Sequence, residues 1–96
     1  MSAVIRYTID TEHCAPTLVG RYFDGYSITS KLGFWRGKSE RSVSIVILAT
    51  ESDRDKVLTL ARDIREQYRQ QEVWITSEPV TLTRITIDAT LEGLPT

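Results

Sequence analysis

The chain has 96 residues, of which 41% are hydrophobic and 26% are charged. This balance is typical of one globular domain and argues against a disordered chain. Lys and Arg number 12 and Asp and Glu number 13, so the formal net charge is -1, which disfavours nucleic acid and acidic membranes as partners. One cysteine cannot form an internal disulfide, and no apolar run approaches the ~20 residues of a membrane span. We expect a soluble, cytoplasmic protein with a single domain, residues 1–96.

The first third of the chain predicts a strand, a short helix and a second strand. Apolar and polar residues alternate over residues 3–11, which is the period of a half-buried strand. Residues 12–24 carry apolar residues at spacings of three and four behind Pro16, and proline is tolerated in the first turn of a helix. After the turn signal Asp24-Gly25, residues 26–34 alternate again and predict the second strand.

The middle of the chain predicts a central strand and the longest helix. A polar connection over residues 35–41 leads into residues 42–49, which are apolar on both parities, as in a strand covered on both faces. Residues 52–69 have an apolar stripe at positions i, i+3, i+4 and i+7, which indicates an amphipathic helix. Ser52 is the expected N-cap of this helix.

The last part of the chain predicts two strands and a frayed tail. Residues 72–77 and 82–90 both alternate between apolar and polar positions. Glu78-Pro79 is expected to separate the two strands, because proline cannot donate to a sheet ladder. Residues 91–96 are expected to fray.

These elements predict an α+β fold. Short connections and right-handed crossovers arrange the first six as a ferredoxin-like βαββαβ antiparallel sheet with the helices on one face, plus an extra C-terminal strand. Because residues 42–49 are apolar on both parities, we expect another subunit to cover the helix-free face of the sheet. The protein is therefore predicted to be a homo-oligomer.

The run Glu12-His13-Cys14 contains the only His and the only Cys of the chain. Imidazole and thiolate are ligands for zinc or copper, but two adjacent ligands complete no site and no second cysteine is available. A Cys–His nucleophile couple would need a third, orienting residue, and the sequence offers none. We therefore predict no metal and no cofactor, with His13 and Cys14 as turn residues.

Residues 35–41 are the most suggestive stretch for binding. Arg36, Lys38 and Arg41 surround a glycine and follow Trp35. Backbone amides beside a glycine, together with Arg and Lys, can hold a phosphate or carboxylate, and an indole can stack on a base or a guanidinium. The alternative is a solvated hairpin tip whose charges serve solubility. No glycine motif of a nucleotide-binding loop is present.

Most of the aromatic side chains are expected in the core on the basis of parity. Tyr22, Tyr26 and Trp74 could instead line a cavity between the sheet and a helix. The carboxylates of Asp10, Glu72, Glu78 and Asp88 are scattered near strand ends, and no spacing marks two of them as an acid–base pair.

Residues 32–48, LGFWRGKSERSVSIVIL, resemble the strand–loop–strand of small trimeric PII/CutA-type ferredoxin-like proteins. The Gly–Trp stretch and the pair Gln71-Glu72 before Val73-Trp74-Ile75 are also similar to the uncharacterised DUF3574-like proteins. The resemblance covers residues 26–76. The similarity to CutA-type proteins implies a trimer rather than a dimer. It also implies a contact with metal, although no set of metal ligands is matched in this sequence. The long signalling loop of PII proteins is absent, so the resemblance does not extend to nucleotide sensing.

The leading hypothesis is a non-enzymatic, oligomeric binding or regulatory domain. It would bind a small anionic ligand or a protein partner through residues 35–41. The expected ligand-binding residues are Tyr26, Trp35, Arg36, Lys38, Arg41 and Glu72. One alternative is a cofactor-free enzyme of the dimeric α+β-barrel type, with Tyr22, Tyr26, His13 or a carboxylate as its catalytic group. A second alternative is a structural or inhibitory interaction protein.

Overall fold

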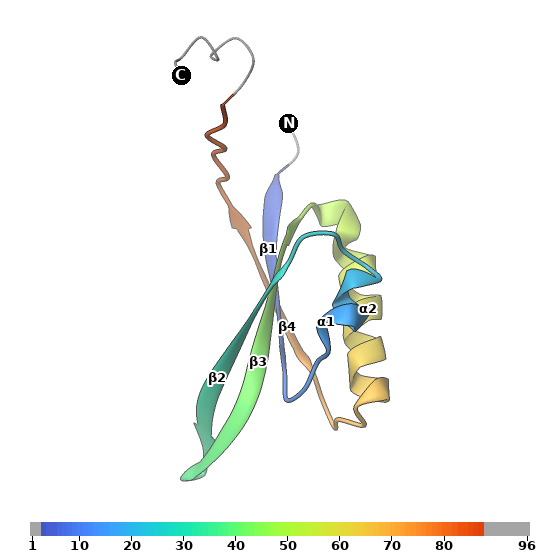
Figure 1. Cartoon of the computed structure of the whole chain (residues 1–96), viewed down its shortest axis with the longest axis vertical. Helices are drawn as coiled ribbons and strands as arrows, with labels where there is room; N and C mark the ends of the chain where they lie inside the picture. The colour runs from blue at the N-terminus through green and yellow to red at the C-terminus, as the bar shows by residue number, and fades with distance from the viewer. Residues whose placement is uncertain (1–2, 88–96) are drawn as a thin grey trace.

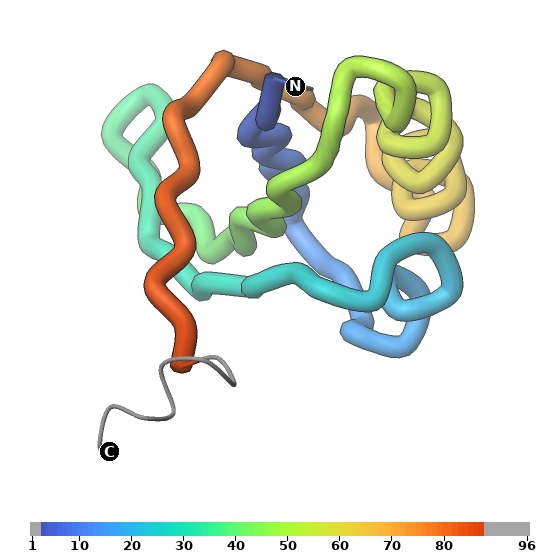
Figure 2. The backbone as a smooth tube through the Cα atoms, turned by 90° about the horizontal axis from the view of Figure 1, so that it is seen from above, coloured from blue at the N-terminus to red at the C-terminus, as the bar shows by residue number. Residues whose placement is uncertain are grey.

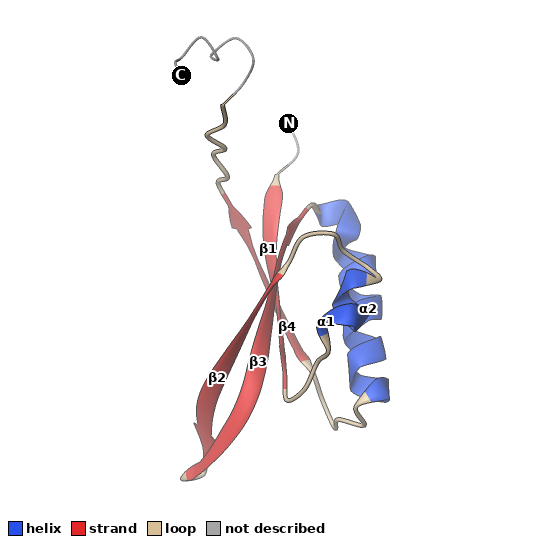
Figure 3. Ribbon diagram, viewed as in Figure 1, coloured by secondary structure: helices blue, strands red, loops and turns tan. Residues whose placement is uncertain are grey.

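The structure, a computed structural model, describes residues 3–87. The protein is α+β: one four-stranded antiparallel sheet carries two helices on one of its faces (Figure 3). In chain order the elements are β1 (Val4–Thr11), α1 (Pro16–Gly20), β2 (Ser27–Trp35), β3 (Lys38–Ala49), a 3-10 turn (Glu51–Asp53), α2 (Arg54–Gln67) and β4 (Trp74–Val80).

The strands lie in the order β2-β3-β1-β4, and every neighbouring pair is antiparallel (Figure 1). The chain segments containing α1 and α2 therefore each connect two strands that are not neighbours in the sheet. β1 and β3 are the central strands, and β2 and β4 form the two edges. A view along the long axis shows both helices on the same side of the sheet (Figure 2).

The core lies between the helices and the sheet. Alternation places Ile5, Tyr7 and Ile9 of β1 on the helix side, opposite Ala49, Ile47 and Ile45 of β3. α2 buries its apolar stripe against them, and α1 adds two residues. The buried hydrophobic residues are Ile5, Tyr7, Ile9, Leu18, Val19, Ile45, Ile47, Val57, Leu60, Ala61 and Ile64. Burial of a large apolar side chain contributes about 1.5–3 kcal/mol, so this layer holds the helices on the sheet.

The N-terminus of α2 differs from the prediction. A capping box joins Thr50 and Asp53, with the Thr50 backbone N–H donating to Asp53 Oδ2 at 3.0 Å. These two residues enclose one 3-10 turn, so the α-helix begins at Arg54 and Ser52 is not its cap. The Tyr7 hydroxyl also donates to the Thr50 carbonyl at 2.7 Å, which ties this turn to the core.

At the C-terminal end of α2, Gln70 connects the helix to the loop after β1. Its Oε1 accepts hydrogen bonds from Thr11 Oγ1 at 2.6 Å and from the Glu12 backbone N–H at 2.8 Å. Gln70 and Thr11 are both buried, and a buried polar group needs such partners to avoid a desolvation penalty. Arg69 precedes this residue with a φ of 52°, in the left-handed region that reverses a chain after a helix.

The predicted connection over residues 35–41 is a two-residue turn. Trp35 pairs with Lys38, and β3 already begins at Lys38, four residues before the predicted start. Arg36 and Gly37, the two central residues, have φ values of 51° and 79°. Positive φ at both positions defines the type I′ turn, which matches the twist of a β-hairpin and favours glycine. β2 and β3 therefore form one continuous hairpin that extends beyond the helices (Figure 1).

β4 continues through Pro79 instead of ending before it. Pro79 pairs with Ile5 in the register of β4 with β1. Proline is tolerated there because β4 is an edge strand, whose outward N–H groups have no partner. The predicted extra strand is not formed over residues 82–87, which have no secondary structure. The rest of that predicted strand and the 91–96 tail lie outside the described residues.

The helix-free face of the sheet is less apolar than predicted. Val46 and Leu48 of β3 lie on it, and Leu48 is exposed. The neighbouring strands contribute polar side chains, with ion pairs between Arg6 and Glu78 at 3.0 Å and between Lys31 and Asp10 at 2.6 Å. Of the two central strands, only β3 is apolar on both faces, and the covering of this face by a second copy stays a prediction.

Candidate functional site

A concavity of about 540 Å³ lies at the end of the sheet where β1 ends and β4 begins, beside the β2–β3 hairpin. We call it the two-tryptophan concavity. Most of its lining belongs to the helix-free face. The lining residues are Asp10, Thr11, Glu12, Lys31, Gly33, Phe34, Trp35, Glu40, Ser42, Gln71, Glu72 and Trp74. A volume of this size is within the ~300–1,000 Å³ typical of ligand sites.

Both tryptophans of the chain line the concavity and both are exposed. Trp35 is 67% exposed at the hairpin tip, and Trp74 is 61% exposed at the start of β4. Trp74 pairs with Asp10 in the register of β4 with β1, which puts it on the helix-free face. Its indole N–H donates to Glu72 Oε1 at 3.0 Å. The expectation that Trp74 lies in the core or in a cavity under a helix is therefore wrong.

The lining carries more negative than positive charge. Its four carboxylates belong to Asp10, Glu12, Glu40 and Glu72, and its one cation is Lys31. Lys31 is already bound to Asp10 at 2.6 Å. Within residues 3–87, the other three carboxylates form no ion pair.

Asp10 is held in its ionised form. Burial raises the pKa of this carboxyl, but the hydrogen bonds from Lys31 and from the Ser44 hydroxyl outweigh burial, so the pKa lies below its ordinary value. A carboxylate fixed by an ammonium and a hydroxyl cannot serve as an acid near neutral pH. Asp10 therefore fixes the floor of the concavity by linking β1 to β2 and β3.

The three cations predicted as ligand donors do not converge. Arg36 lies over the Trp35 ring, with its guanidinium carbon 5.6 Å from the ring centroid. Lys38 pairs with Trp35 in the hairpin register, whereas Arg41 pairs with Leu32. Because alternate residues of a strand face opposite sides, Lys38 and Arg41 lie on opposite faces of the sheet. None of the three lines the concavity.

Of the other predicted ligand-binding residues, Trp35 and Glu72 meet at the concavity and Tyr26 does not. Tyr26 lies between α1 and β2, where its hydroxyl donates to the Pro16 carbonyl at 3.0 Å. There it packs against the core. Its role in the structure is to hold the loop after α1 against the helix layer.

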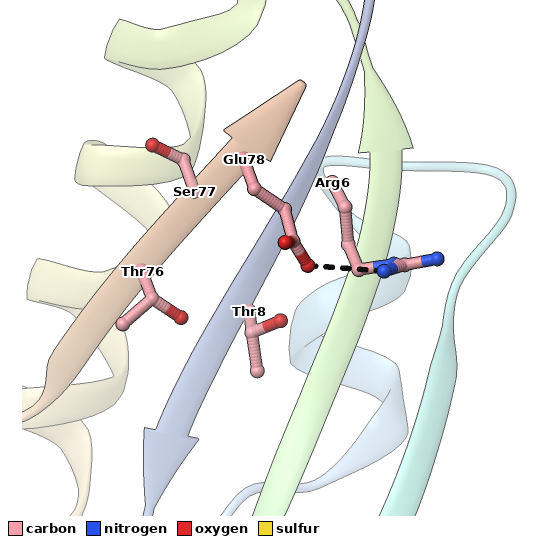
Figure 4. Close-up of a pocket in the computed structure, with 5 residues that line it drawn as sticks. All are labelled: Arg6, Thr8, Thr76, Ser77 and Glu78. Atoms are coloured by element: carbon pink, nitrogen blue, oxygen red, sulfur yellow. Dashed lines mark hydrogen bonds and ion pairs between the residues drawn. The ribbon is translucent and has the colours of Figure 1, made fainter. Parts of the chain in front are cut away.

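A second, smaller hollow of about 210 Å³ lies further along β1 and β4 (Figure 4). Arg6 and Glu78 lie opposite each other in its wall and form the 3.0 Å ion pair. The other lining residues are the hydroxyl-bearing Thr8, Thr76 and Ser77. Because the two charges neutralise each other, this hollow offers no unpaired charge to a ligand.

His13 and Cys14 lie in the loop between β1 and α1. No group of three His, Cys, Asp or Glu residues that could hold a metal occurs among residues 3–87. Burial raises the pKa of the Cys14 thiol, which disfavours the reactive thiolate. The His13 ring instead lies 6.4 Å, centroid to centroid, from the ring of Tyr68.

The space between sheet and helices is filled by side chains. Tyr7, Ile9 and Ile45 from the sheet are fully buried there against Leu60 and Ile64 of α2. Tyr22 lies at the border of this layer, where its hydroxyl donates to the Asp63 carboxylate. That hydrogen bond is the main reason that the pKa of Tyr22 lies above its ordinary value. The large concavity is on the opposite side of the sheet from this layer.

The sequence analysis missed most of the concavity. Asp10 was noted only as a scattered carboxylate, and Glu12, Lys31 and Glu40 were not among the named ligand-binding residues. Strand parity was available as a signal, since Asp10 lies between the buried residues Ile9 and Thr11, and Lys31 has the opposite parity to Ile28, which packs against the core. Parity alone does not show that β1, β3 and the start of β4 lie side by side at one end of the sheet.

The chain matches no protein-family model and no curated protein. Over residues 3–87, no helix has both the length and the apolar character needed to cross a membrane. The interpretation of function therefore depends on the geometry of the chain itself.

Proposed function

We propose that the protein is a non-enzymatic binding domain whose two-tryptophan concavity takes the ammonium or guanidinium group of a cationic ligand. The observation that carries this proposal is the composition of the lining: two exposed indoles and four carboxylates around a single, already paired cation. The expectation from the sequence was an anionic ligand. The charge of the concavity favours the opposite sign.

The carboxylates supply the attraction. Glu12, Glu40 and Glu72 line one open concavity and have no cationic partner among the described residues. A positive group that enters the concavity relieves the repulsion among these carboxylates and gains charge-assisted hydrogen bonds, which are stronger than neutral ones. Because the site is open to water, salt will weaken the attraction.

The indoles supply the contact surface. A cation over an indole face gains about 0.5–1 kcal/mol when exposed and more when water is excluded. The Trp35 ring already accepts one cation, the Arg36 guanidinium, at 5.6 Å. Trp74 is oriented by its hydrogen bond to Glu72, so its ring is held in place before a ligand arrives.

We also propose that the fold is ferredoxin-like and that the resemblance to PII/CutA-type proteins reflects it. The order of elements along the chain is strand, helix, strand, strand, helix, strand, and the sheet order is β2-β3-β1-β4. Both features are compatible with a βαββαβ layer. This proposal concerns the fold alone and carries no ligand over from those families.

Two of the alternatives have less support. An anionic ligand would need Arg36, Lys38 and Arg41 to converge, and they are divided between the two faces of the hairpin. A barrel-type enzyme would need a cavity between sheet and helices, where the side chains of the core are packed. A structural or inhibitory interaction protein is compatible with the concavity if its partner presents a Lys or Arg side chain.

Intrinsic fluorescence tests the proposal directly, because the chain has two tryptophans and both line the concavity. We expect spermine, used as a cationic probe at low salt, to change the emission in a saturable manner. Glu40→Gln and Glu72→Gln should each weaken the apparent affinity about tenfold, since each removes one charge-assisted contact.

The matched control is Glu66→Gln, an exposed carboxylate on α2 that does not line the concavity. It should leave the spermine titration unchanged. Pyrophosphate serves as the anionic probe. Saturable binding of pyrophosphate that Arg36→Ala and Lys38→Ala abolish, without binding of spermine, would overturn the proposal in favour of an anionic ligand.

A further inference from the structure

We propose that residues 81–87, which we call the C-terminal arm, add as a strand to the outer edge of β2 in a second copy of this chain. The inference is independent of the ligand-binding proposal. It rests on an exposed segment with the composition of a strand and on a sheet edge that lacks the usual protection.

The C-terminal arm has the pattern of a strand but pairs with no strand among residues 3–87. Its sequence, TLTRITI, is rich in β-branched residues and carries one charge, Arg84. Ile85 is 94% exposed and Ile87 is 88% exposed. The arm leaves the end of β4 and extends beyond the sheet (Figure 1). β-branched residues at alternating positions favour pairing within a sheet.

The outer edge of β2 is the natural acceptor. β2 has nine residues, contains no proline and forms one border of the sheet. Its one charged residue is Lys31, whose ammonium is held by Asp10. Soluble proteins protect edge strands with charges, prolines or bulges, because a bare edge pairs with other chains. β4, the other edge, contains Pro79 and Glu78 and is protected in this sense.

The arm and the β2 edge each carry two exposed apolar side chains that could cover one another. Leu32 and Phe34 have the parity of Ile28, which faces the core, but pair with the part of β3 that lies beyond its last pair with β1, Thr11–Val43. They are 56% and 70% exposed. A strand added to β2 with Ile85 and Ile87 on that side would cover these two residues and bury its own isoleucines in the same step.

The arm cannot reach this edge in its own chain. Val80 pairs with Val4 at one end of β1, whereas Leu32 pairs with Arg41, beyond the opposite end of β1. The eight residues of β1 span about 26 Å at about 3.3 Å per residue, and β2 lies three strand spacings, or about 14 Å, from β4. The seven residues of the arm extend at most about 23–25 Å. The acceptor must therefore belong to another copy.

Sedimentation equilibrium at micromolar concentration tests the proposal. We expect the wild-type chain to have a multiple of the 10.9 kDa monomer mass. Ile85→Lys with Ile87→Lys should raise the dissociation constant about 100-fold or more, because two buried isoleucines are replaced by charges. Ser30→Glu with Leu32→Glu should do the same from the acceptor side. The control is Thr59→Lys with Gln67→Lys, which adds two charges at exposed positions of α2 and should leave the mass unchanged.

Mixing the two dissociated variants provides the second readout. Each variant retains one half of the interface. The arm variant, Ile85→Lys with Ile87→Lys, has an intact β2 edge, and the edge variant, Ser30→Glu with Leu32→Glu, has an intact arm. We expect the mixture to form a complex that contains both chains. Any one of four results would overturn the proposal. The wild-type protein could be monomeric, the arm variant could keep the wild-type mass, the edge variant could keep that mass, or the mixture could stay monomeric. Circular dichroism of all variants checks that the fold is retained.

Discussion

Asp10 links three strands through one carboxylate at the floor of the two-tryptophan concavity. It accepts hydrogen bonds from Lys31 of β2 and Ser44 of β3, and its side chain is only 26% exposed. The register explains the contact, since Asp10 is opposite Ser44 and Ser44 is opposite Thr29, two residues from Lys31. A single side chain therefore joins the hairpin to the centre of the sheet.

Asp10→Asn should lower the free energy of unfolding by about 1 kcal/mol at pH 7, because the amide keeps the shape but loses the charge-assisted hydrogen bonds. The pKa of Asp10 in the folded state lies below its ordinary value, because the hydrogen bonds from Lys31 and Ser44 outweigh burial, so folding favours the ionised form. The stabilisation is complete above the pKa of the unfolded chain and is lost as the pH falls through the folded-state pKa. The difference between variant and wild type should therefore shrink below pH ~4 in urea titrations.

The companion measurement is the same urea series with Glu66→Gln, which removes an exposed carboxylate of α2. That variant should follow the wild type at every pH. A destabilisation by Asp10→Asn that persists unchanged at pH 2 would mean that shape, and not charge, is responsible.

Single residues differ in how far the sequence predicts them. The alternation in residues 3–11 predicted the buried set Ile5, Tyr7 and Ile9, because a period of two directly encodes the two faces of a strand. The same reasoning misplaced Trp74. Parity divides a strand into two faces but does not say which face the helices cover, and that depends on residues far away in the chain.

The transition from β3 into α2 shows how local chemistry sets the boundary of an element. Thr50 and Asp53 form a capping box, and the hydrogen bond from the Thr50 backbone N–H is the largest cause of the lowered pKa of Asp53. Ser52 lies between these two residues, with its Oγ 2.8 Å from Thr50 Oγ1. The sequence analysis expected Ser52 as the cap, but the capping box in the structure begins at Thr50, three residues before the acid Asp53.

Thr50→Ala should lower the free energy of unfolding by about 1 kcal/mol, the typical cost of losing an N-cap. Ser52→Ala is the matched control, because it removes a hydroxyl of the same turn that caps nothing, and its effect should stay within about 0.5 kcal/mol. Chemical denaturation followed by far-UV circular dichroism measures both. Equal losses for the two variants would contradict the assignment of the cap.

Among the elements, the two helices and the four strands of the sheet were predicted to within about four residues at each end. The two-residue hairpin turn, the continuation of β4 through Pro79 and the absence of a further strand over residues 82–87 were not predicted. Charged residues at 38–41 concealed the start of β3, because this part of the strand lies beyond the helices and has no core to face. Pro79 was read as an interruption because the sequence does not reveal that β4 is an edge.

At the scale of the whole molecule, the radius of gyration is 16.8 Å, compared with about 12.5 Å for a compact chain of this length. The hairpin and the C-terminal arm extend from the body at opposite ends of its long axis (Figure 1). The concavity belongs to this scale too, because its lining comes from four strands and two loops. No short sequence motif could have predicted it.

If association through the C-terminal arm contributes to stability, the melting temperature will depend on protein concentration by mass action. We expect the wild-type melting temperature to rise by about 5 °C over a hundredfold increase in concentration. The Ile85→Lys, Ile87→Lys variant should melt at one temperature throughout that range. Scanning fluorimetry measures both, and a concentration-independent wild type would contradict the expectation.

The hydrogen bonds of Gln70 have a consequence for how quickly the concavity can be filled. They fasten the backbone of Glu12 to the end of α2 at 2.8 Å, so this part of the rim is rigid in the empty protein. A cationic ligand of the proposed kind would therefore find this part of the rim already in place and would not have to wait for a loop to close. Association with such a preorganised rim would be governed by diffusion and by long-range electrostatic attraction. Differences in affinity among ligands would then lie in their dissociation rates.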